Sequence, residues 1–305
     1  MKEEILNIIY SKLPTQEKKI KKYFLEIPEM ENDLISFLEQ YNEFMKLENI
    51  TPENLAKAYL EMIDQMMFAR KEFLHTGKYY SKNQEEAFNH TYDDEAFMTN
   101  YMLGLALSQF LWKHHYLMFN YYKSILKDIE KKSKVLEVGS GHGLFLLEML
   151  KVIDQNQVID VVDISKSSIR ITQNIIKSID KNSSGLIKFY NSDINCYKTA
   201  QKYDFITMGE VLEHVDNPLA ILKSLYDLLD EDGKLFITTC ANCPTIDHVY
   251  LFDDIEDIRR LISEAGFEID SEFVVSTEDK SDEYLKKFKV DISYASVLKK
   301  IKDKQ

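Results

Sequence analysis

The segment that most constrains this chain runs from Val135 to Gly143 and reads Val-Leu-Glu-Val-Gly-Ser-Gly-His-Gly. It places three of the nine glycines of the chain within five residues. The apolar run from Lys134 to Val138 is typical of a buried parallel strand, and the run from Leu144 to Leu150 is typical of a buried helix. Glycine permits positive φ and lets backbone N–H groups approach a ligand closely. The sequence therefore predicts a strand, a glycine turn and a helix that cradle a phosphate or a cofactor.

The spacing of these glycines separates the turn from two other glycine motifs. The order is Gly139-x-Gly141-x-Gly143, and Leu144 stands where a dinucleotide-binding fingerprint has its third glycine. A nicotinamide-dependent dehydrogenase is therefore disfavoured. A P-loop is excluded because no Gly-Lys-Ser/Thr follows the turn.

Acidic residues stand at the ends of the next two predicted strands. The strand from Val158 to Val162 leads into Asp163, and the strand that starts at Ile187 leads into Asp193. A carboxylate at the end of the second strand can accept hydrogen bonds from both hydroxyls of a ribose. The alternatives are that Asp163 caps the following helix and that Asp193 is a solvated loop residue. A further segment, 203–215, reads Tyr-Asp-Phe-Ile-Thr-Met-Gly-Glu-Val-Leu-Glu-His-Val.

With these four motifs in this order, the chain resembles the class I, Rossmann-like S-adenosylmethionine-dependent methyltransferases that act on small molecules. Segment 203–215 resembles their fourth-strand motif, including that of the ubiquinone-pathway O-methyltransferases. The resemblance covers about residues 130 to 300 and implies S-adenosyl-L-methionine as the cofactor. It also implies an α/β fold with a doubly wound, mostly parallel seven-stranded sheet whose last strand is antiparallel.

The resemblance assigns roles to individual cofactor-binding residues. Asp163 would hold the ribose, and Glu210, which follows the fourth strand, would lie near the amino group and the transferred methyl. The residues that would line the adenine are Ile164, Asp193 and Ile194. The residues that would cradle the methionine end of the cofactor are Glu137, Gly139, Ser140, Gly141 and Gly143.

The chain divides near residue 130. Residues 1–130 read as successive helices and predict an all-helical lid or substrate domain, whereas 131–305 predict the methyltransferase domain. Thr51-Pro52 marks the start of a helix of about twenty residues. Residues 76–93 predict a loop, and Asp93 or Asp94 predicts the cap of the next helix.

Strand and helix patterns alternate after the division, as in a parallel doubly wound sheet. We expect Asn217 to cap a helix that carries Leu229 on its apolar face. Three further elements are expected in order: a strand over 234–239, a helix over 252–265 and an antiparallel pair over 268–275 and 290–298. The polar run 276–283 predicts the loop within that pair.

Composition excludes several classes of function. The net charge of −13 argues against a nucleic-acid partner, which would require a basic surface. No stretch of 18 apolar residues occurs, and the first residues, Met-Lys-Glu-Glu, do not open a signal peptide. We therefore expect a cytoplasmic protein without a membrane partner, whose acceptor is small or tethered to a carrier. Homodimerisation through the N-terminal helices is left open.

The acceptor must lose a proton if the methyl group goes to oxygen or nitrogen, and histidine is the default base near neutral pH. His248 ranks first because it resembles the family's His-x-x-x-Phe segment, and His214 ranks second. His114 and His115 follow, within the aromatic run from Trp112 to Phe119, which predicts either a packed helix or part of a substrate pocket. For each of these histidines, a packing or capping role is the alternative.

Cys240, Cys243 and His248 raise the question of a metal. A structural zinc site needs four ligands at fixed spacing, and the chain has no second cysteine pair. No metal is therefore expected.

The sequence leaves the function open in two respects. The acceptor, and the choice among oxygen, nitrogen and carbon, cannot be read from it. A same-fold enzyme that performs another reaction on the cofactor, such as its cyclisation, remains an alternative. So does a non-catalytic cofactor-binding module that engages a partner protein.

Overall fold

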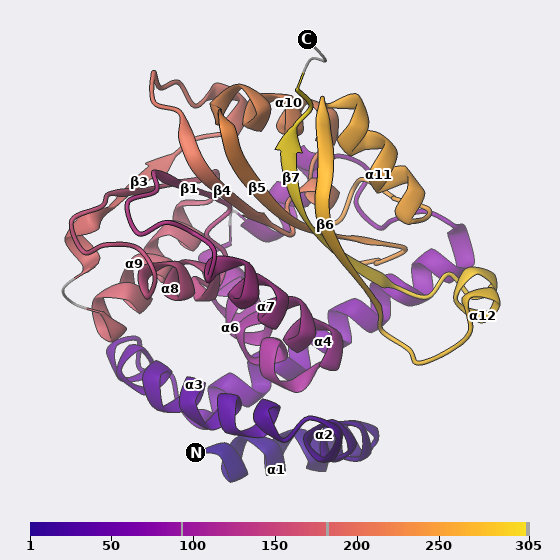
Figure 1. Ribbon diagram of the computed structural model, residues 1–305. Coiled ribbons are helices and arrows are strands. Elements are labelled where there is room, and N and C mark those ends of the chain that lie inside the picture. The colour runs from indigo at the N-terminus through magenta and orange to yellow at the C-terminus, as the bar shows by residue number, and fades with distance from the viewer. Residues whose placement is uncertain (93, 181–182, 303–305) are drawn as a thin grey trace.

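The computed structural model describes residues 1–92, 94–180 and 183–302. Its centre is a seven-stranded sheet in the order β3-β2-β1-β4-β5-β7-β6 (Figure 1). Strands β1 to β5 pair in parallel, and β7 runs antiparallel to both of its neighbours, β5 and β6. The expected α/β fold with an antiparallel last strand is confirmed. The strands are β1 (Val135–Val138), β2 (Ile159–Asp163), β3 (Ile187–Asn191), β4 (Tyr203–Gly209), β5 (Leu229–Ala241), β6 (Phe267–Ser276) and β7 (Ile292–Lys300).

The two faces of the sheet are covered by different helices, because successive strand residues point in opposite directions. Val135 and Phe205 face a cluster that includes the N-terminal helices, α8 (Leu144–Leu150) and α9 (Lys166–Ile179). Leu136 and Ile206, the next residues along the same strands, face α10 (Pro218–Leu228) and α11 (Ile255–Glu264).

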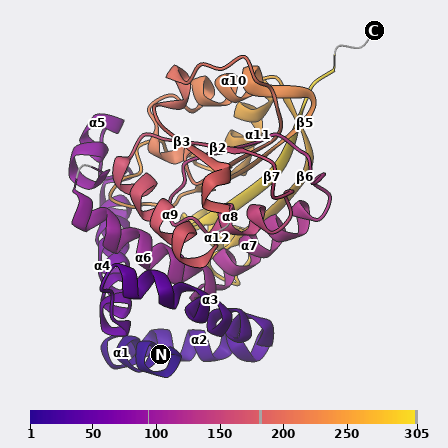
Figure 2. The same cartoon turned by 90° about the vertical axis from the view of Figure 1, so that its left-hand side faces the viewer.

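Helices fill the first part of the chain and lie against one side of the sheet (Figures 1 and 2). The longest, α4, begins after Thr51, whose side chain accepts a hydrogen bond from the Asn54 backbone, and ends at Gly77 in the left-handed conformation. The N-terminal helices are α1 (Lys2–Lys12), α2 (Pro14–Glu26), α3 (Pro28–Leu47), α4 (Pro52–Thr76), α5 (Gln84–Ala87), α6 (Glu95–Leu111) and α7 (Lys113–Leu126).

These helices share their core with the sheet. One continuous cluster of buried side chains extends from Ile5 in α1 to Val297 in β7. At the end of α3, Glu48 accepts hydrogen bonds from Arg170 and Asn174 of α9, at 3.1 and 2.6 Å. The order changes from helices to alternating strands and helices between α7 and β1, as expected. Whether the chain forms two domains divided at residue 130 stays a prediction.

The loop predicted over 76–93 is partly helical. Asn83 accepts a hydrogen bond from the Glu86 backbone and so caps the short α5, which continues into a π-helical turn over Phe88–Tyr92. The expectation was wrong because the side-chain cap and the packing of this segment outweigh its polar composition. Asp94 caps α6, as one of the two predicted alternatives, whereas Asp93 lies outside the described residues.

Three expectations for the second half are wrong. Strand β5 begins at Leu229 and not at residue 234, because Leu229 pairs with Tyr203 of β4 and so leaves the helix. Helix α11 begins at Ile255 and not at residue 252, because Asp254 caps it. The run between β6 and β7 contains a short helix, α12 (Asp282–Lys287). Among the described residues, no helix is both long and apolar enough to cross a membrane.

The packing of α6 against α4 depends on Gly104, which predicts a stability effect. A Cβ at this position would lie 3.0 Å from the Ala58 carbonyl oxygen and 3.0 Å from Met62 Cβ. We expect Gly104→Val to lower the free energy of unfolding by about 1–3 kcal/mol, because the helices must separate. Urea denaturation would measure this. Gly185→Ala is the control, since no heavy atom lies within 4 Å of its added Cβ. If both variants match the wild type, the close contact does not exist.

Candidate active site

The glycine turn after β1 has the backbone conformation that its sequence predicts. The φ angles are +78° at Gly139, +46° at Gly141 and +72° at Gly143, all in the region that other residues rarely adopt. A Cβ on Gly139 would come within 2.8 Å of Val211 Cγ2. The turn therefore requires glycine for both its conformation and its packing.

Asp163 at the end of β2 connects this turn to the second strand. Its Oδ2 accepts hydrogen bonds from the backbone N–H of Ser140 (2.8 Å) and from the Ser140 hydroxyl (2.9 Å). Its Oδ1 accepts from the backbone N–H of Ser165 at 2.7 Å. Burial raises the pKa of Asp163, and these hydrogen bonds oppose the shift. The cap of α9 is Ser165, whose side chain accepts a hydrogen bond from the Ser168 N–H, so Asp163 does not cap that helix. A carboxylate accepts about four hydrogen bonds, so these three leave Asp163 the capacity for about one more donor.

One cavity of about 750 Å³ opens at the carboxyl ends of the strands, where doubly wound sheets bind their ligands. Gly143 is not among the described residues that line it; its N–H donates to the Ser140 carbonyl, and it precedes α8. The other predicted cofactor residues all line the cavity, and they are Glu137, Gly139, Ser140, Gly141, Asp163, Ile164, Asp193, Ile194 and Glu210. Their contacts with the cofactor stay a prediction.

The three remaining acids of this set occupy different environments. Glu137 is buried, and burial together with the Asp163 charge raises its pKa well above the usual value. Asp193 accepts a hydrogen bond from the Asn195 backbone at 2.8 Å. Glu210 has a φ of +50°, and its N–H donates to the carbonyl and hydroxyl of Thr238. A left-handed conformation at a residue other than glycine is characteristic of functional sites.

All four candidate histidines line the same cavity. His114 and His115 lie beside Trp112 at the start of α7, so the helix that carries them is packed and also faces the cavity. Burial lowers the pKa of His114 to about 3. His115 Nδ1 lies 2.8 Å from the Ser108 hydroxyl, and burial lowers its pKa well below the usual value.

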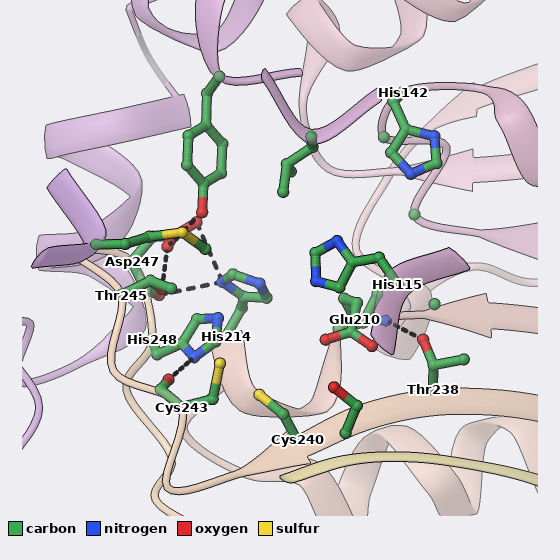
Figure 3. A pocket seen from close by; sticks show the side chains of 18 of the residues that line it. His115, His142, Glu210, His214, Thr238, Cys240, Cys243, Thr245, Asp247 and His248 are labelled. Atoms are coloured by element: carbon green, nitrogen blue, oxygen red, sulfur yellow. Dashed lines mark hydrogen bonds and ion pairs between the residues drawn. The ribbon is translucent and has the colours of Figure 1, made fainter. Parts of the chain in front are cut away.

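His214 is paired with Asp247, a residue that the sequence did not single out (Figure 3). His214 Nδ1 lies 3.4 Å from Asp247 Oδ2 and 3.2 Å from the Asp247 carbonyl oxygen. The Thr245 hydroxyl donates to Asp247 Oδ1 at 2.6 Å. Burial works to raise the pKa of Asp247, but the His214 and His248 imidazoles and the Thr245 hydroxyl together hold it below its usual value. In the sequence, only its position next to His248, in a loop that follows a strand, could have indicated Asp247 as a site residue.

His248 packs edge-on against His214, with ring centroids 4.6 Å apart. Its Nδ1 lies 2.6 Å from the Cys243 carbonyl oxygen. A carbonyl only accepts, so Nδ1 carries the proton and Nε2 keeps its lone pair. Burial lowers the pKa of His248 to about 3, so the ring is neutral at physiological pH.

The N-terminal helices form part of the wall of the cavity. Met66 and Arg70 of α4 and Tyr101 and Gln109 of α6 contribute to its wall. Arg70 Nη1 donates to Asp291 Oδ1 at 2.8 Å and to the Asn242 carbonyl at 3.1 Å, which joins α4 to the strand ends. No sequence motif identified these residues, because only the packing of α4 and α6 places them there.

The chain is similar in sequence to known methyltransferases. A model of the methyltransferase domain matches residues 111–272, just over half of the chain. The chain is 30% identical over 113 residues to malonyl-[acyl-carrier protein] O-methyltransferase 1 of Ilyobacter polytropus, covering 37% of this chain and 40% of that protein. It is 35% identical over 119 residues to the ubiquinone biosynthesis O-methyltransferase of Coxiella burnetii, covering 38% and 48%. The matched segments thus span less than half the length of these relatives.

Two solved structures are also similar. N-methyltransferase NodS from Bradyrhizobium japonicum, in complex with S-adenosyl-L-homocysteine, has a TM-score of 0.49 at 15% identity and covers 63% of this chain and 89% of its own. A SAM-dependent methyltransferase from Aquifex aeolicus has a TM-score of 0.43 at 18% identity and covers 58% and 88%. On the match of the domain model, the chain belongs to the S-adenosylmethionine-dependent methyltransferase family.

Proposed function

We propose that this protein transfers the methyl group of S-adenosyl-L-methionine to an oxygen or nitrogen atom of a small or carrier-tethered metabolite. The observation that carries the proposal is that one cavity contains both the glycine turn with its strand-end acids and the His214–Asp247 pair. The relatives named above act, by their names, on a carrier-bound malonyl group and in ubiquinone biosynthesis. A cytoplasmic location, the absence of a nucleic-acid partner and a homodimer stay predictions.

Methyl transfer requires little covalent chemistry from the protein. The methyl group of a sulfonium is already activated, so the protein must hold donor and acceptor in line and exclude water. The glycine turn and Asp163 would fix the methionine and ribose parts of the donor. Glu210 follows β4 and would lie near the donor's amino group, beside the methyl that is transferred.

The N-terminal helices would then provide the acceptor side. The wall formed by Met66, Tyr101 and Trp112 is apolar or aromatic, with Gln109 and Arg70 as polar groups among them. Such a lining can exclude water while a few polar groups orient the acceptor. This supports the predicted role of residues 1–130 as a lid and substrate region.

We assign the role of general base to His214. The sequence ranked His248 ahead of it, but the Asp247 carboxylate contacts His214 Nδ1 and can orient that ring. The Nδ1 proton of His248 is held by the Cys243 carbonyl, and its burial opposes a positive charge. His114 and His115 are likewise buried as neutral rings.

A first prediction concerns the cofactor. Asp163→Ala should weaken S-adenosyl-L-methionine binding by about 1.5–3 kcal/mol, the range for hydrogen bonds to a charged group. Gly139→Val should weaken it further, because the side chain collides with Val211 and cannot adopt the positive φ. Isothermal titration calorimetry measures both, with the exposed Asp128→Ala as the control. Wild-type affinity in both variants would place the cofactor elsewhere.

A second prediction concerns the proton. His214→Gln should lower kcat by about 10²–10⁴ while cofactor affinity is preserved, because only the deprotonation of the acceptor is lost. Asp247→Asn should lower kcat in the same direction, since the ring loses its charged partner. The corresponding Gln variants of His114 and His115 are the comparison. If none of the variants, His248→Gln included, lowers kcat tenfold, positioning alone carries the catalysis.

A further inference from the structure

Three potential metal ligands converge at the end of β5, on the wall of the same cavity. The sulfur atoms of Cys240 and Cys243 and a ring nitrogen of His248 all lie within 4.8 Å of one another. Figure 3 shows the two sulfur atoms near each other beside the His248 ring. A tetrahedral zinc ion with ordinary bonds to sulfur and nitrogen holds its ligand atoms about 3.3–3.8 Å apart. Small side-chain rotations would therefore suffice to bind one.

The backbone conformation between Cys240 and Cys243 brings the two cysteines close together. Asn242 has a φ of +53°, which turns the chain back after β5. Its N–H donates to the Phe252 carbonyl at 3.0 Å, and its side chain donates to the Asp253 carbonyl at 2.8 Å. The Tyr79 hydroxyl accepts a hydrogen bond from the Cys243 N–H at 3.1 Å. This conformation is fixed by three partners and does not depend on the sulfur atoms.

His248 already has the hydrogen bond that metal-binding histidines use. Metal-ligating imidazoles almost always donate their second ring N–H to a carbonyl or a carboxylate, which fixes the tautomer and the ring orientation. His248 Nδ1 makes this bond to the Cys243 carbonyl, and Nε2 is left as the metal-binding nitrogen. The loop that supplies one sulfur ligand thus also orients the nitrogen ligand.

A buried glutamate adjoins the cluster as a further potential ligand. Glu213 is fully buried, and its Oε2 accepts a hydrogen bond from the Thr239 hydroxyl at 2.7 Å. Its Oε1 is buried and accepts no hydrogen bond from an N–H or hydroxyl group of any described residue. The same acid belongs to two adjoining groups of potential ligands, one with His214 and His248 and one with Glu210 and Cys240. Burial and the neighbouring Glu210 carboxyl raise the pKa of Glu213 well above its usual value, so Glu213 adds a potential oxygen ligand beside the two thiols and not a fixed negative charge.

We propose that Cys240, Cys243 and His248 bind a zinc ion and leave its fourth coordination position open to the cavity. The absence of a second cysteine pair excludes only a closed structural site, because catalytic zinc sites use three protein ligands and two cysteines with one histidine are a known set. Two thiolates neutralise the ion, which suits a buried position. Thiolate and imidazole ligands select zinc over magnesium or calcium.

The open position extends the proposed methyl transfer, and this step rests on that function. It faces the cavity that also contains Glu210 and His214. A hydroxyl or thiol group of the acceptor would fit there as the fourth ligand, since a metal ion lowers the pKa of a bound hydroxyl or thiol toward neutrality. His214 would then receive the proton.

Metal analysis of the full-length protein tests the site directly. The protein is purified without chelator, and zinc is measured by inductively coupled plasma mass spectrometry. We expect about one zinc per chain in the wild type and in Cys196→Ser, whose exposed thiol is the matched control. Cys243→Ser and Cys240→Ser should bind zinc more than about 100-fold more weakly. Cobalt(II) added to the metal-free wild type should give a thiolate-to-cobalt absorption band that both variants lack.

Cofactor binding separates this inference from the proposed function. Calorimetry with S-adenosyl-L-methionine and circular dichroism on each variant would show that the Cys243→Ser fold and the glycine turn are intact. The zinc site is refuted if the wild type, reduced and metal-free, takes up no zinc, or if Cys243→Ser binds zinc as the wild type does. Neither result would refute the proposed methyl transfer. Stoichiometric zinc in a protein that neither binds the cofactor nor transfers methyl would support the site and refute the proposed function.

Discussion

The carboxylate of Asp163 fixes the two backbone segments on which the cofactor side of the cavity depends. It accepts hydrogen bonds from the N–H and hydroxyl of Ser140 and from the N–H of Ser165. Burying this group is costly, and three hydrogen bonds offset the cost. They also hold the glycine turn at a constant distance from the end of β2. The cavity can therefore present backbone N–H groups to a ligand without relying on flexible side chains.

The sheet could be predicted from the sequence because its signals are local. The apolar runs of β1 and β2 and the three glycines between β1 and α8 each constrain the backbone where they stand. The start of β5 could not be predicted in the same way, because Leu229 fits the apolar face of α10 by its spacing. Its pairing with Tyr203, twenty-six residues earlier, decides the outcome. Pairing across such a separation leaves no mark in a short window of sequence.

In the candidate site, too, residues in local motifs could be predicted and residues placed by long-range contacts could not. The predicted cofactor-binding residues follow a local motif, and nine of the ten line the cavity. Asp247 was missed because its contact with His214 joins the loops after β4 and β5, and no spacing encodes it. The N-terminal wall was missed for a related reason. Helical periodicity predicts α4 and α6, but close contacts such as that of Gly104 with Ala58 decide which side chains reach the cavity.

This division has a chemical consequence. In the proposed function, the cofactor side would use backbone groups and a carboxylate at the ends of β1 and β2, whereas the acceptor side would use side chains from α4, α6 and the loops after β4 and β5, all of which line the cavity. Backbone recognition tolerates few changes in the turn. Side-chain recognition can change with the residues, because loops and helix faces vary without altering the sheet. The groups beside the predicted methyl position, Glu210 from β4 and the Cys240–His248 segment from β5, are where the two sides meet. Under the proposed function, the side chains of the acceptor side would therefore select the acceptor, while the glycine turn and Asp163 would keep the cofactor geometry constant.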